Sequence, residues 1–161
     1  MEPIEKAILK DVALDHIEPV PRQAKNPMDH WTQAILLERA AYLRKLAKHG
    51  DGSASETLKE YPQHRAMLSF RSRSGEVEVH ERFADLFVVL AGSATLVTGG
   101  VVTGARIVAS GETRGASIEG GRHQPLRAGD VAHVPADTPH QMLLKGEETL
   151  ACLVMKVQEA L

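Results

Sequence analysis

The stretch GEVEVHERFADLFVVLAG, residues 75–92, places ionisable side chains at spacings that suit a shared ion. If it forms two strands, residues two apart share a face, so Glu78 and His80 point the same way. A short turn after His80 would then set Asp85 opposite it and Phe87 opposite Glu78. Because opposed side chains on one face are close enough to hold one ion, the stretch predicts a cluster of Glu78, His80 and Asp85.

A second stretch, AGDVAHVPADTPHQM, repeats this arrangement. Its Asp-Thr-Pro segment favours a turn, which would bring His133 opposite Met142 and leave His140 on the same inward face. His140 is therefore a further predicted ligand. The role of His133 stays open among a ligand, a proton shuttle and a wall of the pocket. The predicted apolar lining of this pocket consists of Phe87, Val89 and Met142.

Glu78 has three possible roles in this arrangement. It is a solvent-exposed strand carboxylate, a metal ligand, or a catalytic acid or base whose pKa is raised by burial beside Phe87 and Val89. Its apolar neighbours favour ligation over exposure, and the catalytic role remains an alternative.

The surrounding sequence predicts the elements that must hold these residues. From Ala66 onward, short alternating runs separated by Gly, Pro, Asp and Ser predict an all-β barrel or sandwich of antiparallel strands. Before it, Asn26 and Pro27 are typical of a helix start and Gly50 of a helix end, which predicts a helix over about residues 27–49. The expected organisation is a helical arm over 1–65 and a barrel domain over 66–161.

The predicted helix has one apolar face. This face would pack either on the chain's own sheet or across a homodimer interface. After the loop GDGSAS, residues 55–61 are expected to form a second, short helix that ends at Pro62. The face consists of Trp31, Ile35, Leu36, Ala40, Leu43, Leu46 and Ala47.

Composition and charge exclude several classes of function. The 161 residues carry a formal net charge of −2, with 19 basic and 21 acidic residues spread along the chain, so no footprint for nucleic acid or an anionic membrane is present. The charged N-terminal stretch is typical of neither a signal peptide nor a membrane span, and a cytoplasmic location is expected. Cys152 lies in an apolar run and is predicted to be a core residue.

The two stretches resemble the motifs of the cupin superfamily, over roughly residues 66–157. The first cupin motif is similar to His-x-His, three or four residues, Glu, six residues and Gly. The second is similar to Gly, five residues, Pro-x-Gly, two residues, His, three residues and Asn. The first is matched here by Glu78, His80, Asp85 and Gly92, and the second by Gly129, Pro135, Asp137, His140 and Leu144.

This resemblance implies an antiparallel β-barrel of jelly-roll type that holds one divalent metal ion. Its typical ligands are three histidines and one glutamate, so Glu78 stands in place of a histidine and Asp85 in place of the glutamate. Two histidines with carboxylates suit Fe, Mn, Ni or Zn. Asp85 is one methylene shorter than Glu, so it either ligates the ion or orients His80.

The predicted function is that of a small cupin that binds a metal in its barrel and acts on a small molecule. Oxygenase, isomerase and lyase chemistry all remain open, because a fold does not select among them. The alternative is a metal-free cupin that binds a sugar or an acid without catalysis, so the sequence does not decide whether the protein is an enzyme. A homodimer is expected in either case.

Overall fold

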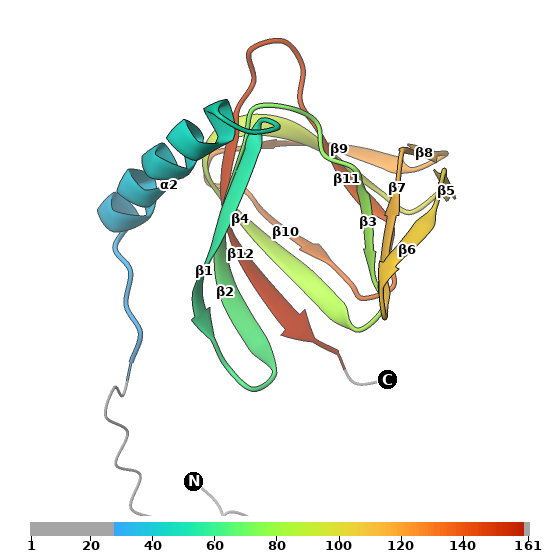
Figure 1. The fold of residues 1–161 in the computed structure, drawn as a ribbon, viewed down its shortest axis with the longest axis horizontal. Helices are drawn as coiled ribbons and strands as arrows, with labels where there is room; N and C mark the ends of the chain where they lie inside the picture. Colours follow the sequence, from blue (N-terminus) through green and yellow to red (C-terminus); the bar gives the residue numbers. More distant parts are fainter. Residues whose placement is uncertain (1–27, 160–161) are drawn as a thin grey trace, which may run out of the picture. The chain divides into compact units, whose positions relative to one another are not determined.

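The computed structural model describes residues 28–159. The chain divides into two units, 1–30 and 31–161, and every described helix and strand lies in the second (Figure 1). No helix within 28–159 has the length and apolar character needed to span a membrane. The elements are α2 (Gln33–Lys48), β1 (Ser53–Glu60), β2 (His64–Arg71), β3 (Val77–His80), β4 (Phe83–Thr98), β5 (Val101–Thr103), β6 (Arg106–Ala109), β7 (Glu112–Gly115), β8 (Ser117–Glu119), β9 (Arg122–Arg127), β10 (Val131–Val134), β11 (His140–Leu143) and β12 (Leu150–Gln158).

The strands form an antiparallel barrel of jelly-roll type, as the sequence predicts, and β4 links its two layers. The first half of β4 pairs with β10 and β12, and its second half pairs with β9 and β11. Gly92 lies between these halves with φ at 82°, and a Cβ there would lie 1.8 Å from the carbonyl oxygen of Thr149. Because glycine alone avoids this clash, the glycine of the first motif has a structural reason.

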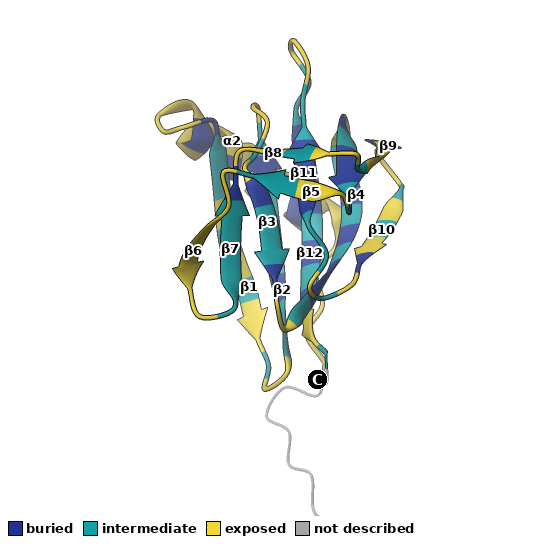
Figure 2. Ribbon diagram, turned by 90° about the vertical axis from the view of Figure 1, so that its right-hand side faces the viewer, coloured by how far each residue is buried: buried dark blue, intermediate teal, exposed yellow. Residues whose placement is uncertain are grey.

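Alternation along the strands separates two sets of side chains, visible in Figure 2 as alternating burial colours. On β2, Met67, Ser69 and Arg71 face the interior of the barrel and line its cavity. Leu68 and Phe70 point to the other face of the same strand, where they pack against α2. The outer face of this strand is therefore apolar, whereas its inner face combines Met67 with the polar Ser69 and the charged Arg71.

Helix α2 packs on the outer face of the chain's own sheet, the first of the two predicted arrangements (Figure 1). Ile35 and Leu46, which the sequence assigns to the buried face, are 44% and 45% exposed. The buried face is thus narrower than predicted, and the homodimer stays a prediction. The side chains in this contact are Leu36, Ala40, Leu43 and Ala47 from the helix, with Leu68, Phe70 and Ala151 from the sheet.

Two predictions about the arm are wrong. The helix begins at Gln33, because Thr32 caps it by accepting a hydrogen bond from the backbone N–H of Ile35, and residues 28–32 are not helical. Asn26 and Pro27, the predicted start, lie outside the described residues. Residues 55–61 form most of β1 instead of a short helix, since pairing with β2 overrides their local preference. The sheet accordingly begins at Ser53, before residue 66.

Leu43→Ala tests the packing of the helix on the sheet. Leu43 lies on the buried face of α2 and is 1% exposed. Truncating a core leucine leaves a cavity, so the free energy of unfolding is expected to fall by about 2–5 kcal/mol in urea denaturation. The matched control is Leu46→Ala at an exposed position of the same helix, with an expected change within about 0.5 kcal/mol. Equally small losses in both variants would contradict the packing described here.

Candidate metal centre

Three strands bring the predicted ligands together, although not through the predicted hairpins. Glu78 and His80 lie on β3, which pairs with β7 and β11, whereas Asp85 lies on β4 beside β10 and β12. The predicted pairing of His80 with Asp85 is therefore wrong. The chain crosses to the facing layer just after His80, so the side chains meet across the interior of the barrel. His140, on β11, pairs with Glu78.

His133 does not belong to the cluster. Strand β10 pairs with β4, not with β11, and its partner for Asp85 is Val134. Val134 is buried in the interior, so the alternation of the strand turns His133 outward, where it is exposed. The predicted role of His133 in the pocket or as a ligand is therefore wrong, because the prediction assumes a hairpin of β10 with β11 that does not form.

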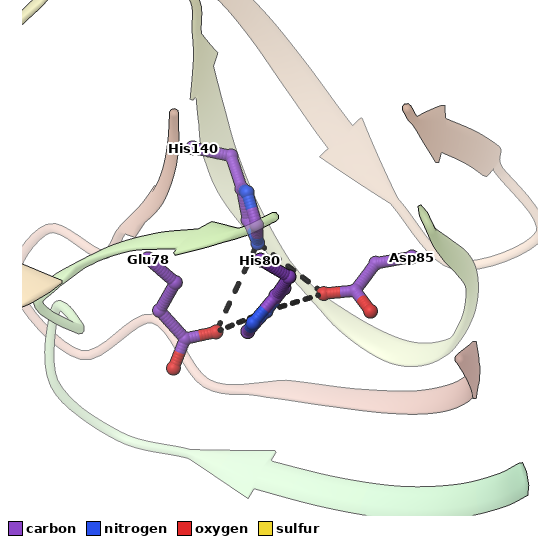
Figure 3. A group of neighbouring side chains, drawn as sticks. All are labelled: Glu78, His80, Asp85 and His140. Carbon is purple, nitrogen blue, oxygen red and sulfur yellow. Dashed lines mark ion pairs between the residues drawn. The ribbon is translucent and has the colours of Figure 1, made fainter. Parts of the chain in front are cut away.

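The four remaining candidates form a compact group. Figure 3 shows the two imidazole rings between the two carboxylates. Each residue offers one possible ligand atom, and these atoms all lie within 4.8 Å of one another. Asp85 Oδ2 lies 3.1 Å from His80 Nε2 and 3.3 Å from His140 Nε2. Glu78 Oε2 lies 3.5 Å and 3.8 Å from the same two nitrogens.

The other nitrogen of each ring is already held by an acceptor. His80 Nδ1 lies 2.5 Å from Glu112 Oε2, and His140 Nδ1 lies 3.0 Å from the carbonyl oxygen of Thr138. If both Nδ1 atoms donate and the rings are neutral, each Nε2 carries a lone pair that can bind a cation held by the carboxylates. Both Nε2 atoms are buried, and neither has a hydrogen-bond partner among the described residues. This is the arrangement of imidazoles that ligate a metal ion.

Electrostatics keep both carboxyl groups ionised. Burial raises the pKa of Glu78, but His80, Arg114 and His140 together lower it to about 2. Burial likewise opposes ionisation of Asp85, yet the two histidines and a lysine hold the pKa of this group well below its usual range. Burial lowers the pKa of His80, and the Asp85 and Glu78 carboxylates raise it to about 9. The raised pKa predicted for Glu78 is therefore not found, and its role as a catalytic acid or base stays a prediction.

Sequence reasoning missed the charged residues around the cluster. Lys156 Nζ lies 2.8 Å from Asp85 Oδ1, and the lysine is only 7% exposed. Arg114 lies 3.2 Å from Glu112 and 3.7 Å from Glu78. Lys156 could have been found, since Cys152, Val154 and Lys156 share a face in the last strand. Glu112 gives no such signal, because its position depends on the pairing of β7 with β3.

A cavity of about 140 Å³ adjoins the cluster inside the barrel. Phe87 and Met142 line it, as predicted, whereas Val89 is buried in the interior core and is not part of the lining. Cys152 also lines the cavity and is 1% exposed, and burial raises the pKa of its thiol to about 12. Its prediction as a core residue is confirmed, and its thiol is un-ionised at neutral pH.

Comparison with known proteins agrees with this architecture. A family model described as the cupin domain matches residues 104–156. The TT1209 protein from Thermus thermophilus has a similar structure, with a TM-score of 0.56 at 16% identity over 83% of this chain and 100% of that chain. No curated protein matches the sequence.

Two further structures resemble the chain less closely. KdgF from a Halomonas species gives a TM-score of 0.49 at 16% identity, covering 68% of this chain and 83% of its own. The polyketide cyclase RemF from Streptomyces resistomycificus gives 0.47 at 17% identity, covering 68% of both. At these identities the comparisons concern the fold. The match of residues 104–156 to the cupin-domain model and the jelly-roll barrel together support membership of the cupin superfamily.

Proposed function

We propose that this cupin binds one divalent transition-metal ion through Glu78, His80, Asp85 and His140 and acts as an enzyme on a small molecule in the adjoining cavity. The observation that carries the proposal is the pair of buried Nε2 atoms on His80 and His140. Both are without a hydrogen-bond partner among the described residues, and both face two ionised carboxylates. A buried imidazole nitrogen without a partner is costly, and a metal ion would remove that cost.

The donor set fits Fe, Mn, Ni or Zn. Two imidazoles and carboxylate oxygens suit the borderline divalent ions, and Asp85 and Glu78 are anionic before any ion arrives. Glu112 and the Thr138 carbonyl would hold the two rings in the tautomer that ligation needs. When bound, such an ion supplies Lewis acidity toward a substrate oxygen.

The protein's own residues would shape the site around the substrate. Phe87 and Met142 form an apolar wall of the cavity, which limits water beside the reacting atoms. Glu78 is the ligand nearest to solvent, with its side chain 31% exposed, whereas His80, Asp85 and His140 are almost fully buried. Substrate would therefore approach the cluster from the side of Glu78.

A metal-free binding cupin remains a second candidate because of one observation. Asp85 already has an ion pair with Lys156, and its other oxygen lies 3.1 Å from His80 Nε2 and 3.3 Å from His140 Nε2, close enough to pair with protonated rings. With protonated rings, the cluster would satisfy itself without an ion. In that case the cavity would hold a sugar or an acid, with Glu78, His80 and His140 as polar anchors.

Metal content separates these two candidates. Protein purified without chelator or a nickel column is expected to carry about one divalent ion per chain by elemental mass spectrometry. His80→Ala and His140→Ala should each lower metal affinity by at least about 100-fold, more than an outer-shell change does. The matched control is His133→Ala, an exposed histidine outside the cluster, which should keep the ion. Wild-type protein that takes up no ion under any loading condition would support the metal-free candidate.

Lys156→Met tests direct contact between Asp85 and the ion. Without Lys156, the buried Asp85 loses its lysine partner and keeps only the two histidines, so the free energy of unfolding of the metal-free protein should fall by up to about 3–5 kcal/mol. Metal should restore part of this loss, because the ion then pairs with the freed carboxylate. The rise in Tm on adding metal is therefore expected to be larger in the variant than in the wild type, by thermal unfolding.

Lys145→Met is the control for this variant, because Lys145 is exposed and changes the net charge equally. It should alter neither the stability of the metal-free protein nor the response to metal. An identical rise in Tm for Lys156→Met and the wild type would count against Asp85 as a ligand.

A further inference from the structure

Arg71 is a charged residue of the cavity that the metal site does not use. It ends β2 on the face directed into the barrel, beyond Met67 and Ser69. It lines the central cavity together with Asp85, His140 and Phe87. It also lines a second hollow, which lies against the loop between β2 and β3 and includes Glu78. Arg71 therefore lies where both hollows meet, on the side of the cluster that is nearest to solvent.

The guanidinium of Arg71 has no ion pair among the described residues, although it is half-buried. The nearby acids have other partners. Asp51, whose pKa Arg71 helps to lower from a distance, accepts hydrogen bonds from Ser53. Glu76 pairs with Arg106 at 2.5 Å, and Glu78 lies 3.7 Å from Arg114. The other partly buried cations, Arg65, Arg114 and Lys156, each have a carboxylate within ion-pair distance. An unpaired guanidinium in a cavity wall is a ready anion site.

Charge in the cavity points the same way. Lys156 offsets Asp85, so a divalent ion would face only the remaining charge of Glu78, and Arg71 adds a further positive charge. The loaded cavity would thus carry a net positive charge that an anionic ligand can neutralise. Gly75 keeps space for this cation, because a Cβ there would lie 2.7 Å from Arg71 Nη1.

We propose that Arg71 binds the carboxylate of a small carboxylic acid whose second oxygen donor reaches the metal ion. This inference rests on the metal site of the proposed function and names its substrate class. The planar guanidinium can bind a carboxylate through two parallel hydrogen bonds, which fixes the orientation of the acid. The cavity of about 140 Å³ has room for roughly five waters at about 30 Å³ each, the scale of a short carbon chain. Phe87 and Met142 would contact that chain.

The test uses the full chain loaded with Co(II), whose visible absorption changes when a new ligand reaches the metal. Succinate and glutarate each have two carboxylates, so one can bind Arg71 while the other reaches the ion. Acetate has a single carboxylate, so any change it causes in the spectrum reports binding to the ion alone. Arg71→Gln is expected to weaken succinate or glutarate binding by about tenfold to 100-fold, as for the loss of a charged hydrogen-bonded pair. Acetate binding should stay unchanged. Arg44→Gln, at an exposed position on α2, is the matched charge control and should bind all three acids as the wild type does.

Gly75→Ala is a second variant, which moves the guanidinium but keeps its charge. The methyl group would displace the flexible end of Arg71, so the diacids should bind more weakly than to the wild type while acetate is unaffected. Equal diacid affinities in the wild type and Arg71→Gln, with a normal Co(II) spectrum, would overturn the role of Arg71 alone. Equal losses for acetate and the diacids, or no response to either diacid in the wild type, would also overturn it. Absence of any Co(II) spectrum in the wild type would overturn the metal site. It would also overturn the proposal that the acid binds Arg71 and the ion together.

Discussion

The structure depends on how the barrel accommodates the buried carboxylate of Asp85. This group is 3% exposed and ionised, and an isolated charge in such a place would be very costly. Three cationic or potentially cationic groups surround it, Lys156 from β12, His80 from β3 and His140 from β11. These strands belong to both layers of the barrel. The negative charge of Asp85 is therefore compensated only when both layers have come together. The site and the fold are therefore coupled.

The spacing of the first motif follows from this arrangement. Asp85 lies in the half of β4 that pairs with β10 and β12, and Gly92 ends that half where the strand passes into the other layer. The number of residues between Asp85 and Gly92 therefore corresponds to the stretch of β4 that runs from the cluster to the edge of this layer. A residue with a side chain at position 92 would clash with the Thr149 carbonyl and shift both halves. The spacing of the motif therefore has a structural reason in the barrel as well as in the candidate metal cluster.

The sequence predicted which residues converge but not how. In a barrel, every inward-pointing side chain reaches the same interior, so strand parity alone sufficed for Glu78, His80, Asp85 and His140. The pairing partners were wrong because two strands adjacent in sequence need not be hydrogen-bonded in a jelly roll, where the chain alternates between layers. The prediction for His133 is wrong for that reason, because it assumes a hairpin that β10 does not form. The helix predicted over residues 55–61 is wrong because these residues pair with β2, and sequence periodicity does not reveal such long-range pairing.

Lys156 changes what the altered ligand set means for the chemistry of the site. A second carboxylate beside a divalent ion would ordinarily reduce the charge on the ion and weaken its action on a substrate oxygen. Here the lysine lies against Asp85 Oδ1 and leaves Oδ2 directed at the two histidines. The ion would then experience Asp85 as a partly neutralised, single-oxygen donor and Glu78 as the more exposed anionic donor. In charge, such a centre is close to one with two histidines and a single carboxylate, so replacing one histidine by Glu78 does not by itself remove Lewis acidity.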